Sequence, residues 1–358
     1  MVIRPVYRLP ILAVAMMTLL AALWGGLGRL GFQPAQFYSP PVVFHGPLMI
    51  SGFLGTLIGL ERAVALNRGW PYFGPLLSGS GALCLIAGLP NPSGPILIAA
   101  ASLVLVMAFG SMLLDHPSLF LSTMGLGAAA WLTGNIFWLL GFPVSQVVYF
   151  WAGFLVLTIV GERLELARMG NLDPFGKWTF LASAGLFSAG LLFSLKDFET
   201  GLRFSGAGMI FLSAWLLKND IARRTVRQKG LPRFIAICLL FGHFWLGVSG
   251  LSVFFLGSAS TGLLYDAALH SLFLGFVFSM IFAHAPIIFP AITGFAVPFR
   301  SRFYIHLVLL HLSLILRTGS DWMGWMQGRS FAGILNVFAI LLFAANTVSS
   351  ILGARNRS

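Results

Sequence analysis

Apolar runs of about 20 residues follow one another along almost the whole chain, from Ile11 to Leu352. A run of that length crosses the hydrocarbon core of a bilayer as an α-helix. Only 9% of the residues are charged, whereas about 25% are charged in a typical soluble domain. The sequence therefore predicts an all-α polytopic membrane protein with about twelve transmembrane helices, and it excludes a soluble fold.

We expect the helices to cover residues 11–30, 41–66, 72–90, 94–115, 117–140, 143–166, 177–195, 202–218, 232–257, 264–290, 303–319 and 331–352. The longest strongly charged connection, near residues 218–232, has only about 15 residues and is too short for a soluble domain. We therefore predict one transmembrane domain over residues 1–358. The first helix lacks a small-residue cleavage site, so we expect it to be retained rather than removed as a signal peptide.

The basic residues are distributed unevenly between alternate connections. The net charge is +12, with 22 lysine and arginine residues. If the N-terminus is cytoplasmic, 17 of the 22 lie on the cytoplasmic side, and the outer side keeps Arg29, Lys196, Arg203, Arg317 and Arg329. The positive-inside rule then predicts a multi-pass protein of the cell inner membrane with both termini in the cytoplasm. The distribution of basic residues explains the positive net charge without a nucleic-acid partner. Membrane lipid is the expected partner, with residues 223–233 near anionic headgroups.

Motifs of soluble enzymes and of metal-bound modules are missing from the sequence. Cys84 and Cys238 fall inside predicted helices and form no C-x-x-C pair, so they predict neither a disulfide framework nor a zinc site. The sequence contains no H-E-x-x-H, no G-x-S-x-G and no glycine-rich phosphate loop. Hydrolysis of the soluble type is therefore not expected, and enzymatic activity stays open.

A short repeat links three of the predicted helices. Residues 52–62 and 153–163 agree at six of eleven positions without gaps, including Gly-Phe-Leu at the start and Glu-Arg at the end. A weaker third copy begins at Gly275-Phe276 and has His284-Ala285 where the others have Glu-Arg. The copies lie in helices 2, 6 and 10, so the repeats predict three parallel four-helix units.

Histidines at bilayer depth are the main candidates for chemistry, because ionisable side chains are costly there. They are His45, His243, His270, His284, His306 and His311, whereas His116 falls in a predicted loop. His45 and His270 both lie within about two turns of the outer face, so they share one layer. Neutral histidine is a common ligand of heme iron. His284 lies about 21 Å further in than His270 and cannot serve the same iron as His45.

The stretch His45-Gly46-Pro47-Leu48-Met49 resembles the His-Gly-x-x-Met of heme-copper oxidase subunit I. The chain also resembles that superfamily in its twelve predicted helices, its predicted cytoplasmic termini and its histidines in helices 2 and 10. The resemblance implies that His45 and His270 are axial ligands of one heme between helices 2 and 10, a b-type heme by analogy. The His-Pro-Glu-Val-Tyr, His-His and His-x-His motifs of the copper site are absent, so copper and dioxygen reduction are not expected.

The helix 2 His-x-x-x-Met and the histidine-rich late helices resemble the NnrS family of twelve-helix heme proteins linked to nitric oxide. The fuller late-helix pattern of that family is absent from this sequence. This resemblance implies a heme-binding membrane protein that handles nitric oxide or electrons, with a small gas or an electron donor as partner.

Other ionisable residues are secondary candidates. His243 lies mid-membrane in helix 9, where a hydrogen-bonded contact between helices or a second site would account for it. His306 and His311 diverge by roughly 140° on one helix and are expected to be packing residues. In each of the pairs Glu61-Arg62 and Glu162-Arg163, the two neighbouring side chains are expected to point apart on their own helix. Glutamate of one copy would then pair with arginine of the other copy. These pairs would form a charged layer on the cytoplasmic side of the membrane, where protons could enter. Ordinary flanking charge at helix ends is the alternative.

Two further functions compete with heme binding. A twelve-helix secondary transporter without heme would use glycine-interrupted helices around a midplane site. Two six-helix halves would, however, show similarity at an offset of six helices, and the copies found here are four helices apart, which favours heme. The other alternative is an inert structural partner of a respiratory complex, in which the histidines only pack.

Overall fold

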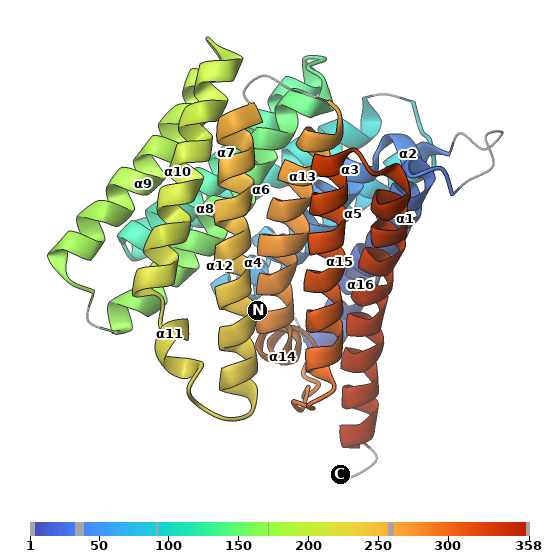
Figure 1. Ribbon diagram of the computed structural model, residues 1–358. Helices are drawn as coiled ribbons and strands as arrows, with labels where there is room; N and C mark the ends of the chain where they lie inside the picture. The colour runs from blue at the N-terminus through green and yellow to red at the C-terminus, as the bar shows by residue number, and fades with distance from the viewer. Residues whose placement is uncertain (1–3, 33–38, 91, 171, 257–260, 356–358) are drawn as a thin grey trace. The chain divides into compact units, whose positions relative to one another are not determined.

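The computed structural model describes residues 4–32, 39–90, 92–170, 172–256 and 261–355, apart from the side chains of Met169, Leu256 and Arg355. Gly257, at the end of the ninth predicted helix, and Arg357, in the predicted cytoplasmic set, lie outside these ranges. Within them the chain is helical, and no strand occurs in the described part. The predicted all-α polytopic fold is confirmed (Figure 1).

The first half of the chain forms η1 (Pro5–Arg8), α1 (Leu9–Arg29), α2 (Pro40–Val43), α3 (His45–Pro47), η2 (Leu48–Gly55), α4 (Thr56–Leu66), η3 (Trp70–Tyr72), α5 (Phe73–Ile86), α6 (Ser93–Asp115), α7 (Leu119–Leu139) and α8 (Val144–Met169). The second half forms α9 (Pro174–Phe193), α10 (Phe198–Asn219), α11 (Ala222–Thr225), α12 (Leu231–Leu256), α13 (Leu263–His270), η4 (Ser271–Phe278), α14 (Ser279–Thr293), α15 (Phe303–Met323) and α16 (Met326–Arg355). Helix is present at each of the twelve predicted spans.

Ten helices of the described chain are long and apolar enough to cross a membrane. The other two predicted spans correspond to α5 and α9. Helix α5 has only 14 residues, which is less than the roughly 20 residues that a spanning helix needs. Helix α9 has 20 residues but carries Lys177 near its start, and this charge makes it less apolar than the ten.

The chain divides into two units: Met1–Phe154 with Pro290–Gly294, and Leu155–Phe289 with Phe295–Ser358. The single domain predicted from the sequence stays a prediction. In the first unit, α1 packs against α2, η2 and α5, and α6 packs against both α5 and α7. Arg8 donates from Nη1 to the carbonyl oxygens of Ala291 and Ile292, at 3.1 and 3.3 Å. These bonds satisfy carbonyl groups near the C-terminal end of α14.

In the second unit, consecutive helices lie side by side, with α10 between α9 and α12 and with α15 beside α16 (Figure 1). Glycines allow the backbones of α9 and α10 to touch. A Cβ atom on Gly190 would lie 2.4 Å from Ser205 N, and one on Gly201 would lie 2.2 Å from Ser194 N. Because lipid gives no hydrophobic drive for helix association, such small-residue contacts supply much of the packing.

Candidate functional site

His45 is held against α1 by a hydrogen bond and by a glycine. It is the first residue of α3, and its Nδ1 lies 2.7 Å from the carbonyl oxygen of Ala22. A carbonyl can only accept, so Nδ1 carries the proton and donates. A Cβ atom on Gly26 would lie 3.0 Å from His45 Cε1, so a larger residue there would push against the ring in this position. The fixed tautomer is the one in which Nε2 can bind a metal.

His270 is anchored in a similar way. It is the last residue of α13, and its Nδ1 lies 2.9 Å from the carbonyl oxygen of Asp266, one turn earlier. The same nitrogen lies 3.3 Å from Asp266 Oδ2. Within the described residues, Nε2 of His270 has no hydrogen bond, and the side chain is 20% exposed. The ring orientation and tautomer again make Nε2 the nitrogen that could bind a metal.

Each of these histidines stands just before a π-helical segment. Segment η2 covers Leu48–Gly55 and η4 covers Ser271–Phe278, so each has eight residues. Gly52-Phe53 and Gly275-Phe276 occupy the fifth and sixth positions of their segments, which is the register of the sequence repeat. Residues of the second copy lie in α8, which is α-helical throughout. Short π segments inside α-helices are frequent at functional sites.

A buried network of charges joins α13, α15 and α16. Asp266 Oδ2 accepts from Arg317 Nη2 at 2.8 Å, and Asp266 Oδ1 lies 3.3 Å from Arg329 Nη2. Arg329 Nε also lies 3.0 Å from Asp321 Oδ1. The Asp321 side chain has no exposed surface. From the sequence these arginines were predicted only as outer charges, and the two aspartates were not predicted to be site residues. Ionisable residues inside apolar helices, such as Asp266 and Arg317, were the signal that could have found them.

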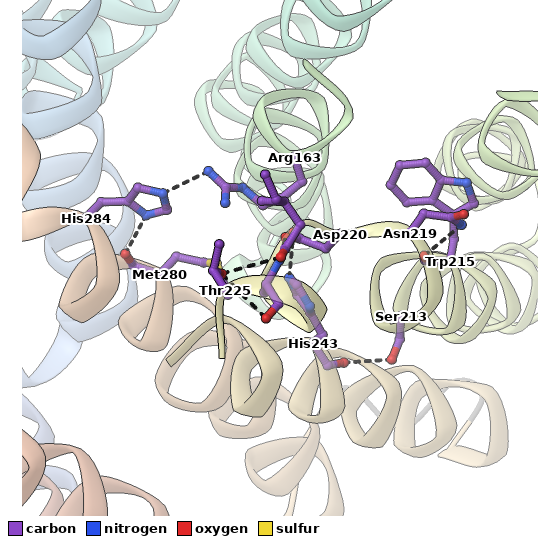
Figure 2. A network of polar contacts seen from close by, with 11 residues as sticks. Arg163, Ser213, Trp215, Asn219, Asp220, Thr225, His243, Met280 and His284 are labelled. Carbon is purple, nitrogen blue, oxygen red and sulfur yellow. Dashed lines mark hydrogen bonds and ion pairs between the residues drawn. The ribbon is translucent and has the colours of Figure 1, made fainter. Parts of the chain in front are cut away.

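The secondary candidates of the repeat form closer pairs than predicted. Arg62 Nη2 lies 3.0 Å from Glu61 Oε1, so the expectation that these neighbours point apart is wrong. Flexible side chains of this length can bend back toward each other even from adjacent positions. Arg163 Nη2 donates to His284 Nε2 at 2.9 Å, while His284 Nδ1 donates to Met280 O (Figure 2). His284 stands where the other copies have glutamate, so this contact joins Arg163 to the third copy, whereas the prediction paired glutamate of one Glu-Arg copy with arginine of the other. Any contribution from Glu162 stays a prediction.

His243 faces a carboxylate that the sequence analysis did not single out. His243 has no exposed surface, and its Nε2 lies 3.5 Å from Oδ2 of Asp220, which is 3% exposed (Figure 2). Asp220 Oδ1 accepts from the Ala222 N–H at 2.8 Å. Within the described residues neither ring nitrogen of His243 has a hydrogen bond. Burial raises the pKa of the Asp220 carboxyl group, and the nearby Arg163 guanidinium opposes that rise. Asp220 was missed because acidic residues at helix ends are common.

His306 and His311 are buried among aromatic rings, in agreement with the prediction that they pack. Trp245 Nε1 donates to His311 Nδ1 at 3.1 Å, and Asn346 Nδ2 lies 3.2 Å from His306 Nδ1. No group of three or more histidine, cysteine, aspartate or glutamate side chains in the described chain is placed to hold a metal ion. The pairing of His45 with His270, which needs only two ligands, stays a prediction.

The fold and these side chains define a polytopic α-helical membrane protein with ionisable groups buried among its helices. The chain belongs to the family described as "Domain of unknown function (DUF8744)", whose model matches residues 8–352. No curated protein matches the chain.

Proposed function

We propose that this protein binds a heme, with His45 and His270 as the two iron ligands, and that it handles nitric oxide or electrons. One observation carries the proposal: each histidine has its Nδ1 fixed on a backbone carbonyl within three residues of the start of a π-helical segment. An imidazole whose Nδ1–H is held in this way presents Nε2 as a preorganised metal ligand. Bound heme would supply one-electron chemistry and affinity for small gases.

The residues fit the chemistry of such a group. Both rings supply a nitrogen of the kind that holds heme iron, and both sit in apolar helices that would shield a porphyrin from water. For His270, the backbone bond to Asp266 adds to a contact with its carboxylate, and both fix the orientation of the ring. The b-type heme and the absence of copper rest on the sequence resemblance alone.

The test is an absorption spectrum of the purified protein, oxidised and dithionite-reduced. We expect a Soret band in the wild type that is lost in His45→Gly and in His270→Gly, and that returns when imidazole is added to either variant. His116→Gly, which removes an exposed loop histidine, is the matched control and should keep the band. A colourless wild type grown with sufficient iron, or an equal loss in the control, would contradict the proposal.

A secondary transporter without heme is the second candidate. It is supported by the ionisable side chains of Arg163, Asp220 and His243, which are buried in an otherwise apolar bundle. Buried charges in transmembrane helices often mark paths for ions or protons. A colourless protein that moves a solute across proteoliposome membranes would favour this function.

We also propose that the protein resides in the cell inner membrane with both termini in the cytoplasm. The support is the uneven distribution of lysine and arginine between alternate connections.

A further inference from the structure

A cavity of about 530 Å³ opens where α8, α10 and α11 end in the second unit. Its walls include the connection from Lys218 to Arg227 and the residues just before α9. Sites for small molecules usually have volumes of about 300–1,000 Å³, so this cavity is large enough for a ligand.

The cavity is lined by an unusual number of cations: Lys218, Arg223, Arg224 and Arg227. None of the four forms an ion pair with a carboxylate of the described residues. Arg223 donates from Nη1 to the carbonyl oxygen of Lys218 at 2.8 Å, which holds one guanidinium at the wall. The positive-inside tendency explains why cations lie at this end of the helices. It does not require them to converge on a concave surface.

Two carboxylates also line the cavity, and both are already used by the backbone. Asp173 Oδ1 accepts from the Gly176 N–H at 2.7 Å and caps α9. Asp220 Oδ1 accepts from the Ala222 N–H at 2.8 Å. The lining therefore holds four cations against two carboxylates that stabilise helix starts, so it attracts anions.

We propose that this basic cavity is a binding site for a phosphate group, carried either by a soluble phosphorylated molecule or by a lipid headgroup. The guanidinium group offers a planar set of donors that matches two phosphate oxygens at once, and lysine adds a further point charge. The cavity is independent of His45 and His270, so the proposal does not depend on heme.

The experiment uses the full chain, purified in a neutral detergent. Inorganic phosphate is titrated by calorimetry at constant ionic strength, with chloride as the compensating anion. The same protein is then placed in nanodiscs of phosphatidylcholine with or without phosphatidylglycerol, and its thermal unfolding is compared. The variants are Arg224→Gln/Arg227→Gln and Lys218→Gln. The matched control is Lys177→Gln, an exposed lysine in α9 that does not line the cavity.

We expect the double variant to weaken binding by about tenfold or more, because each lost charge-assisted bond has a cost of this order. Lys218→Gln should weaken it less, and Lys177→Gln should leave it unchanged. Loss of phosphate binding identifies a soluble source, whereas a loss confined to stabilisation by phosphatidylglycerol identifies a headgroup. The proposal is overturned if wild type responds to neither probe, or if the control loses as much as the double variant.

Discussion

Asp220 is a single residue that lines the basic cavity and also faces the buried His243. Its folded-state pKa lies above the ordinary value of 3.8 because the carboxyl group is buried. The folded protein therefore binds this proton more tightly than the unfolded chain does. The resulting contribution to stability is fully present below pH 3.8 and is lost as the pH rises through the raised pKa.

We predict that Asp220→Asn becomes progressively more stable relative to wild type as the pH is raised from about 4 to about 8. Asparagine keeps an oxygen that can accept the Ala222 N–H and carries no charge at any pH. The measurement is the Tm of both proteins across this range in the same detergent.

Asp197 provides a control of opposite sign, because hydrogen bonds from the Thr200 side chain and backbone hold the pKa of this exposed carboxyl group below 3.8. The contribution of Asp197 is present above pH 3.8 and is lost as the pH falls through the lowered pKa. Asp197→Asn should therefore show its largest deficit at neutral pH. Parallel pH profiles for the two variants would contradict the assignment for Asp220.

Single residues also show what sequence reasoning can reach. His243 and His284 were found because an ionisable residue in an apolar helix stands out in any sequence. Asp220 and Asp321 were not, since a carboxylate near the end of a helix is usually solvated. Their burial is produced by packing between separate helices, such as α10 with α12. No local pattern contains that information.

The helices themselves were predictable, because a bilayer leaves no other way to satisfy the backbone. The π-helical segments η2 and η4 were not, since their residues are as apolar as those of the α-helices around them. The sequence repeat includes Gly52-Phe53 in η2 and Gly275-Phe276 in η4, but it did not indicate that these segments have the wider turn of a π-helix. The helical propensity of a sequence does not separate these two hydrogen-bond patterns.

At the level of elements, we predict that Gly190→Ala separates α9 from α10 and destabilises the protein. The added Cβ would meet backbone atoms of Ser205 at 2.4 Å, and backbone atoms cannot move aside without shifting the helix. Overpacking of this kind typically costs about 1–3 kcal/mol. Gly185→Ala is the matched control in the same helix, because its Cβ would meet no atom within 4 Å. Thermal unfolding should separate the two variants, and equal Tm values would contradict this packing.

For the whole molecule, orientation decides which compartment reaches the basic cavity. The charge pattern predicts that Arg227 faces the cytoplasm and that Lys196 faces outward. The two native cysteines, Cys84 and Cys238, are the only thiols in the chain and can be replaced by alanine. Cysteine is then introduced singly, as Lys196→Cys or as Arg227→Cys.

The cells are treated so that the reagent passes their outer layers while the inner membrane stays intact. We predict that a membrane-impermeant maleimide labels Lys196→Cys in these cells and labels Arg227→Cys only after lysis. The reason is that α10 is long and apolar enough to cross the membrane between the two positions, and the opposite orientation would place most lysine and arginine residues on the outer side. The reverse pattern would invert the topology and open the cavity to the outer compartment, so that only phosphate groups on that side could reach it. Labelling of both positions before lysis would contradict the prediction that the chain crosses the membrane between them.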